Sequence, residues 1–210
     1  MRNIPNVLVM DDFYVAPEEV RELALSLTYS RPLRSNYPGE RTQDLSVCAP
    51  EFYAMWREKF MDIFGGCHDG DWQFSTQFQR IPTVTDDPEA NEGWIHSDPA
   101  EDVGAVIYLN PHPDPDAGTS FMRPVPGTNP HTNSHLYYRN DYYGGRNNIT
   151  TEEFVRAKAM NNSKYVNDTV VCNQFNRLVA FNCKKPHKQT TFGNPTDPYR
   201  LTQVFFARKL

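Results

Sequence analysis

The spacing of apolar residues changes once along the chain, and this change limits the possible folds more than any other feature. Before it, apolar residues recur at helical spacing in two stretches, residues 17–27 and Pro50–Phe64. The first stretch begins with a proline and two glutamates, which is typical of a helix start. From Trp72 onward the period is two. Two helices followed by seven or so strands predict helices packed against a mainly β sandwich or barrel.

The expected strands are short and separated by proline-rich loops. In chain order they cover residues 6–14, 72–81, 93–96, 103–109, 119–122, 169–175, 177–181 and 200–207. We expect one domain spanning 1–210, with an insert at 123–169 that interrupts the series. The insert carries two pairs of adjacent tyrosines, at 137–138 and 142–143, a helix pattern at 150–160 and a net charge of +2 in a chain of −5. Long inserts of this kind are usually functional, and we expect a lid over the substrate; a surface elaboration or an oligomer contact is the alternative.

Composition excludes several classes of protein. The net charge of −5 disfavours binding of nucleic acid through its phosphates. No apolar run is long enough to cross a bilayer, and the first residues, with only four consecutive apolar positions, do not resemble a signal peptide. The four cysteines form no C-x-x-C motif, which favours reduced thiols and a cytoplasmic location.

A histidine and an aspartate two residues apart are the first candidates for chemistry. On a strand, His96 and Asp98 would project to the same face, as two corners of a two-histidine, one-carboxylate iron site. The spacing alone is a weak signal, because His112 and Asp114 repeat it. Prolines flank that second pair, which therefore belongs to a turn.

A third metal ligand must come from a distant strand, and His187 follows the apolar run at 178–181. Arg200 begins the last strand and shares a face with Thr202. An arginine that points into a barrel requires an anion, whereas the alternative is a surface arginine at a strand end. His131 and His135 are expected to be polar loop residues, because proline and asparagine surround them.

These residues occur in a recognisable order. The sequence resembles the Fe(II)/2-oxoglutarate-dependent oxygenases, and within them the prolyl-4-hydroxylase-like branch, from about residue 8 to 207 without the insert. The matching segments are His96-x-Asp98, Tyr108-Leu109-Asn110, Ala117-Gly118-Thr119-Ser120-Phe121, His187 and Arg200-Leu201-Thr202. The branch usually has two glycines where this chain has Ala117 and Gly118, which matters little if the turn needs only one positive φ.

The resemblance implies a double-stranded β-helix (a jelly-roll or cupin-like barrel) with the two helices packed on it. It also implies that His96, Asp98 and His187 hold Fe(II). Arg200 would pair with the distal carboxylate of 2-oxoglutarate, assisted by the hydroxyls of Tyr108 and Thr202.

The implied activity is that of a dioxygenase. It would use O₂ to hydroxylate a C–H bond of a protein side chain or a small molecule, converting 2-oxoglutarate to succinate and CO₂. Asp98 favours hydroxylation, since related halogenases lack this carboxylate. Two alternatives remain: a cupin-like metal- or ligand-binding module without turnover, which needs no Arg200, and a structural jelly roll. The sequence does not indicate the oligomeric state.

Overall fold

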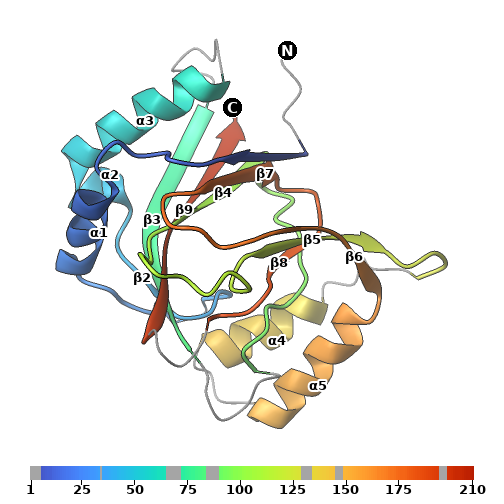
Figure 1. Ribbon diagram of the computed structural model, residues 1–210. Helices are drawn as coiled ribbons and strands as arrows, with labels where there is room; N and C mark the ends of the chain where they lie inside the picture. The colour runs from blue at the N-terminus through green and yellow to red at the C-terminus, as the bar shows by residue number, and fades with distance from the viewer. Residues whose placement is uncertain are drawn as a thin grey trace.

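Two antiparallel β-sheets form the centre of the protein (Figure 1). The computed structural model describes residues 6–33, 35–64, 72–83, 90–128, 134–144, 149–193 and 198–210. In these residues the strand order is β1-β7-β4-β9-β3-β2 in the larger sheet and β6-β5-β8 in the smaller one. This mainly β architecture was expected from the sequence and is consistent with a jelly roll.

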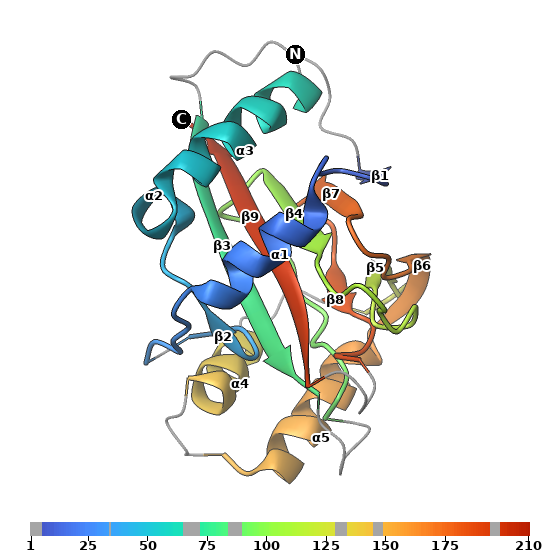
Figure 2. The ribbon, with the colours of Figure 1, turned by 60° about the vertical axis from the view of Figure 1, so that its left-hand side comes forward.

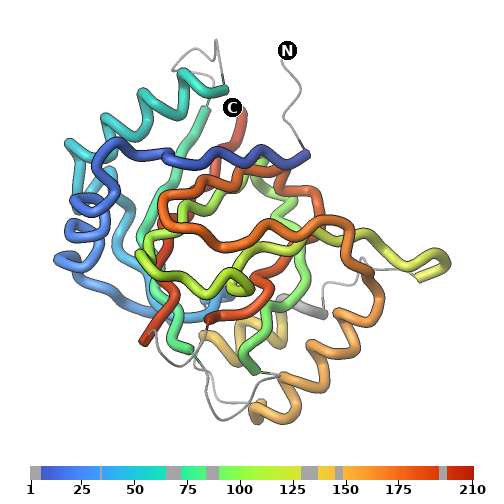
Figure 3. The backbone as a smooth tube through the Cα atoms, viewed as in Figure 1, coloured from blue at the N-terminus to red at the C-terminus, as the bar shows by residue number. Residues whose placement is uncertain are grey.

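The two longest strands, β3 and β9, pair along their whole length in the larger sheet. The larger sheet consists of β1 (Val7–Met10), β2 (Glu40–Arg41), β3 (Trp72–Pro82), β4 (Val103–Tyr108), β7 (Leu178–Asn182) and β9 (Tyr199–Lys209). The smaller sheet consists of β5 (Thr119–Pro124), β6 (Tyr165–Val171) and β8 (His187–Gln189). Figure 3 shows β1 running beside β7, although most of the chain separates them in sequence.

Three helices cover one face of the larger sheet. They are α1 (Pro17–Ser26), α2 (Leu45–Cys48) and α3 (Pro50–Phe64), and Figure 2 shows α1 lying across β3 and β9. From α3, the rings of Trp56 and Phe60 pack against Phe205 of β9 with centroids 5.0 and 4.9 Å apart. Leu201, Phe205 and Ala207 belong to this core and therefore face the helices. Because successive side chains of a strand point to opposite faces, the residues next to them on β9 face the interior between the two sheets.

The insert forms two helices, α4 (Ser134–Tyr143) and α5 (Thr151–Asn162), at the end of the molecule below β5 and β8 (Figure 1). A capping box starts α5: the Thr150 hydroxyl accepts from the Glu153 amide, and the Glu153 carboxylate accepts from the Thr150 amide. Both helices contact Trp94, whose ring lies 6.0 Å from Tyr138 and 5.4 Å from Phe154.

The structure corrects several sequence-based expectations. His135 lies in α4, so the loop that was expected at this residue is wrong. His131 lies outside the described residues. The expected strand at 93–96 is a single bridge between His96 and His187. The strand expected at 169–175 ends at Val171 and begins earlier, at Tyr165 inside the expected insert, where β6 pairs with β5.

Two further features are the state of the cysteines and the length of the apolar helices. Cys48, Cys172 and Cys183 are free thiols, as expected, whereas Cys67 lies outside the described residues. None of the helices in the described part of the chain is long and apolar enough to cross a membrane.

Candidate metal centre

A bridge between the segment before β4 and the first residue of β8 brings two histidines together. The amide of His96 donates to the carbonyl of His187 at 3.0 Å, and the amide of His187 donates back at 2.8 Å. Asp98 follows two residues later, and its amide donates to the carbonyl of Cys183 at 2.9 Å. Main-chain hydrogen bonds therefore fix the relative positions of all three residues.

The three side chains converge. The Oδ2 atom of Asp98 lies 3.4 Å from Nε2 of His187 and 3.7 Å from Nε2 of His96. One ligand atom from each residue lies within 4.8 Å of the other two. Among the described residues this is the only such group of three, and His112 and Asp114 do not take part in it. Two imidazoles and one carboxylate are the donor set that suits non-haem Fe(II).

Each histidine has its other ring nitrogen engaged. The Nδ1 atom of His96 lies 2.8 Å from the carbonyl of Trp94, and Nδ1 of His187 lies 2.9 Å from the carbonyl of Lys185. Since a carbonyl only accepts, Nδ1 carries the proton in both rings and the Nε2 lone pairs are free for a metal.

The charge states of the trio also suit a metal. Burial would raise the pKa of the Asp98 carboxyl, but the neighbouring His96 and His187 outweigh this and hold its pKa below the usual value. Burial lowers the pKa of His96, and the positive charge of Arg139 lowers it further. At neutral pH the carboxylate is therefore ionised and the imidazole is neutral, which are the forms that coordinate metal ions.

Arg200 is buried inside the molecule, with 3% of its surface exposed, and is not a surface arginine at a strand end. Its Nε donates to the carbonyl of Ala117 at 3.0 Å, and its guanidinium carbon lies 5.2 Å from the ring centre of Tyr108. The Tyr108 hydroxyl is hydrogen-bonded to the Thr119 hydroxyl at 2.7 Å. Thr119 in turn lines the cleft that contains the histidines.

Two polar atoms in this Arg200 cluster have no partner. Nη2 of Arg200 and the hydroxyl of Thr202 are both buried without a hydrogen bond. Buried donors are almost always satisfied, so this pair indicates a missing acceptor. A carboxylate fits, because a guanidinium and a hydroxyl offer it several donors at once.

Gly118 differs from its expected role. Its φ is not in the left-handed region; instead, an added Cβ would lie 2.0 Å from the carbonyl oxygen of Val171. Glycine is needed here because β6 approaches closely, next to the Ala117 carbonyl that binds Arg200.

Two further arginines line the cleft beside the three candidate ligands. Arg41 comes from β2 and Arg139 from α4. Neither arginine was expected at the site from the sequence. The available signal was the positive charge of the insert, but no motif or spacing connects an arginine of α4 to His96.

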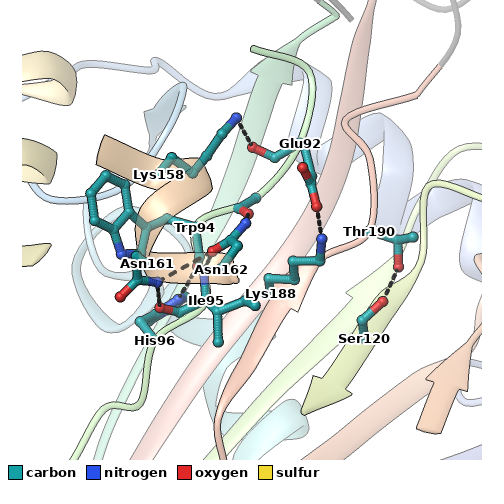
Figure 4. Close-up of polar contacts among 11 residues, drawn as sticks. Glu92, Trp94, Ile95, His96, Ser120, Lys158, Asn161, Asn162, Lys188 and Thr190 are labelled. Carbon is teal, nitrogen blue, oxygen red and sulfur yellow. Dashed lines mark hydrogen bonds and ion pairs between the residues drawn. The ribbon is translucent and has the colours of Figure 1, made fainter. Parts of the chain in front are cut away.

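The last turn of α5 holds the segment that precedes His96 (Figure 4). The Asn161 side-chain amide donates to the Ile95 carbonyl at 2.9 Å, and the Asn162 side-chain oxygen accepts from the Ile95 amide at 3.0 Å. Lys158 donates to the Glu92 carbonyl at 2.9 Å, and the Glu92 carboxylate forms an ion pair with Lys188. The insert is thus attached to the segment that carries a candidate ligand.

Solved structures share this fold. HygX from Streptomyces hygroscopicus, with nickel, 2-oxoglutarate and hygromycin B bound, matches with a TM-score of 0.58 at 16% identity, over 98% of this chain and 84% of HygX. A 2OG-Fe(II) oxygenase family oxidoreductase from Burkholderia pseudomallei gives 0.54 at 15%, over 97% and 84% of the two chains. A prolyl-4-hydroxylase from Pseudomonas putida gives 0.51 at 17%, over 98% and 93%.

The expected resemblance to 2-oxoglutarate- and iron-dependent oxygenases is confirmed at the level of the fold. The sequence matches no curated protein. A family model described as a family of unknown function, DUF6445, matches residues 2–189. The chain therefore belongs to the DUF6445 family and has the fold of the 2-oxoglutarate- and iron-dependent oxygenases.

Proposed function

We propose that this protein is an Fe(II)- and 2-oxoglutarate-dependent dioxygenase that hydroxylates a C–H bond, and that its two sheets form a double-stranded β-helix. The observation that carries the proposal is the combination of two sites in one interior. The Nε2 atoms of His96 and His187 and the carboxylate of Asp98 converge on one another, and Arg200 nearby has a buried guanidinium nitrogen without a partner.

His96, Asp98 and His187 would hold the iron. When bound, the iron and 2-oxoglutarate supply the oxidation of a C–H bond by O₂, with succinate and CO₂ as coproducts. The carbonyls of Trp94 and Lys185 keep the two imidazoles in the tautomer that coordinates through Nε2. Iron held by these three residues would have further coordination positions available for other ligands. Asp98 would occupy the position that chloride takes in the related halogenases.

Arg200 would bind the distal carboxylate of 2-oxoglutarate. The free Nη2 of Arg200 and the free hydroxyl of Thr202 would donate to it, and the Tyr108 hydroxyl could turn from Thr119 to add a third bond. The charges of the site would also balance. Fe²⁺ with the Asp98 carboxylate has one positive charge, the 2-oxoglutarate dianion changes this to one negative charge, and Arg200 neutralises it.

We propose that the substrate is a small molecule or a peptide side chain and that the insert at 123–169 acts as its lid within a single domain. HygX was solved with hygromycin B, and another match is a prolyl-4-hydroxylase. Arg139 of α4 lines the cleft, and α5 is bonded to the segment before His96, which supports a role at the site. A surface elaboration would need neither contact.

An anaerobic titration tests the proposal. Adding Fe(II) and then 2-oxoglutarate should produce a weak visible charge-transfer band, which Asp98→Ala abolishes and Arg200→Ala weakens. His112→Ala is the matched control, because this exposed histidine belongs to the other His-x-Asp pair and leaves the band unchanged. Metal uptake without the band would indicate a cupin-like binding module, and no uptake would indicate a structural jelly roll.

A further inference from the structure

Two arginines of the cleft lack an acidic partner. The cleft is lined by His96, Asp98 and His187 and also by Arg41 and Arg139. No ion pair joins either arginine to a carboxylate within the described residues. Arginines placed in such an interior are costly unless an anion meets them.

Arg139 is the more deeply buried of the two. Only 6% of its surface is exposed, and its Nε has no hydrogen-bond partner. Burial lowers the pKa of its guanidinium, and the negative charge of Asp98 offsets part of this effect. Its helix, α4, is packed against Trp94 through Tyr138, so the side chain is held over the cleft by the core of the insert.

Arg41 approaches from β2. Its guanidinium stacks over the ring of Tyr37 at 3.8 Å, and its two terminal nitrogens lie 3.4 Å from the side-chain oxygens of Gln77 and Gln79. Its Nε is buried without a partner. Burial lowers the pKa of Arg41 to about 10, and the positive charge of Arg139 contributes to the decrease. The negative charge of Asp98 offsets part of this decrease, and the two guanidiniums repel each other as like charges.

The remaining charges of the cleft do not neutralise this pair. Lys188 is paired with Glu92, and Asp98 faces the two histidines. Fe²⁺, Asp98, a 2-oxoglutarate dianion and Arg200 sum to zero. The two arginines therefore add positive charge to the cleft beyond what the metal ion, Asp98, the oxoacid and Arg200 balance among themselves.

We infer that Arg41 and Arg139 bind an anionic group of the substrate, a carboxylate or a phosphate, and so orient it toward the metal centre. The inference that the anion belongs to a substrate rests on the proposed function, whereas the anion site itself does not depend on it. Two converging guanidiniums suit both oxyanions, since each offers a planar pair of donors. The lid then contributes a specificity-determining residue as well as cover.

The competing explanation is that Arg139 only offsets the charge of Asp98. In that case Arg139→Gln would change the affinity of the site for a metal ion and would have no effect on anion binding. The two explanations therefore differ in two separate measurements.

The first experiment uses inorganic phosphate and acetate as probes, titrated calorimetrically into the full-length protein, both metal-free and loaded with Ni(II) and 2-oxoglutarate. We expect saturable binding that Arg41→Gln and Arg139→Gln each weaken by about tenfold or more. Arg139→Lys should retain part of the affinity, which separates loss of charge from loss of folding. Arg123→Gln, at an exposed arginine of the same insert, is the matched control and should bind as the parent does.

Equal binding by the parent and Arg139→Gln, or no binding by the parent, overturns the inference. Phosphate binding without acetate binding assigns the site to phosphate esters, and the reverse assigns it to carboxylic acids. If the Fe(II)–2-oxoglutarate band is absent while arginine-dependent anion binding persists, the proposed function fails and the anion site stands. Candidate substrates that are carboxylic acids can also be compared with their uncharged primary amides. If the band is present but the acids and the amides stimulate succinate formation equally, the anion site fails and the proposed function stands.

Discussion

At the scale of single residues, Arg200 carries more information than its charge. Its Nε is already bonded to the Ala117 carbonyl, so the free Nη2 is held in a fixed direction. A lysine would keep the positive charge without this second bond or the planar fork. We expect Arg200→Lys to weaken 2-oxoglutarate binding by about tenfold or more while the affinity for Fe(II) is unchanged.

The measurement is the 2-oxoglutarate concentration that gives half of the charge-transfer band, compared with a separate Fe(II) titration. Arg177→Lys provides the control, since Arg177 is paired with Asp11 and does not line the cleft. An unchanged half-saturation in Arg200→Lys would mean that charge alone binds the oxoacid.

Another residue-scale prediction concerns pH and the ion pair between Asp11 and Arg177. Arg177 donates from Nε and Nη2 to the two carboxylate oxygens at 2.5 and 3.0 Å, and the hydrogen bond lowers the pKa of Asp11. A lowered pKa stabilises the folded state above the unfolded value of about 3.9, and this stabilisation is lost as the pH falls through the folded value.

We therefore expect Asp11→Asn to lower the free energy of unfolding by about 0.5 kcal/mol at neutral pH, a small effect because the pair is exposed. Urea unfolding at several pH values should show the difference from the parent shrinking as the pH falls below the unfolded pKa of about 3.9 and disappearing in stronger acid. A difference that persists in acid would assign the effect to packing instead.

At the scale of secondary-structure elements, α5 acts on the metal centre through the segment before His96. Asn161 is buried and satisfies the Ile95 carbonyl (Figure 4). Asn161→Ala would leave that carbonyl unpaired, at a cost of about 1–3 kcal/mol in the free energy of unfolding. We also expect weaker binding of Ni(II), because the segment is free to shift the His96 ring.

Chemical denaturation and a Ni(II) titration check both effects. Met160→Ala on the same helix is the control, since 67% of that side chain is exposed. A variant that loses stability but binds Ni(II) as tightly as the parent would show that α5 does not position His96.

The helix α3 belongs to the core of the larger sheet. Trp56 is fully buried and packs against Phe205 of β9 with ring centres 5.0 Å apart. We expect Trp56→Ala to lower the free energy of unfolding by about 3–5 kcal/mol, because it leaves a large cavity. Met55→Ala, at the exposed neighbour, should change it little; equal losses in the two variants would contradict this packing.

Elements with a regular pattern could be predicted from the sequence, and elements held by tertiary contacts could not. α3 and β9 have clear periods and lie where expected, α3 with the expected ends. α4 has a polar and aromatic sequence without a helical stripe and depends on the contact between Tyr138 and Trp94. β8 has three residues, too few for a visible period.

The same distinction applies to the site. The order and spacing of His96, Asp98, His187 and Arg200 follow the elements that carry them, so a motif could indicate them. Arg139 reaches the cleft because α4 packs on Trp94, and this placement depends on the missed helix. The residues proposed to bind the cosubstrate were therefore accessible from sequence, whereas those proposed to select the substrate were not.

At the scale of the whole molecule, the proposed ligand groups come from parts of the chain that lie far apart in sequence. His187 begins β8 of the smaller sheet, Arg200 lies on β9 of the larger sheet, and His96 belongs to the segment held by α5. Metal and 2-oxoglutarate would thus link both sheets and the insert in the folded state only. Such ligands stabilise the fold in proportion to the logarithm of their excess over Kd.

We expect Ni(II) and 2-oxoglutarate, each at about 100 times its Kd, to stabilise the parent by about 2.7 kcal/mol per ligand. For a chain of this size each ligand then raises Tm by roughly 5–10 °C in a thermal melt. Asp98→Ala should lose both increments, because the oxoacid requires the metal, whereas Arg200→Lys should keep the increment of the metal and lose most of that of 2-oxoglutarate. A full 2-oxoglutarate increment in Asp98→Ala would mean that the oxoacid binds away from the three candidate ligands, and the proposed arrangement of the two sites would then be wrong.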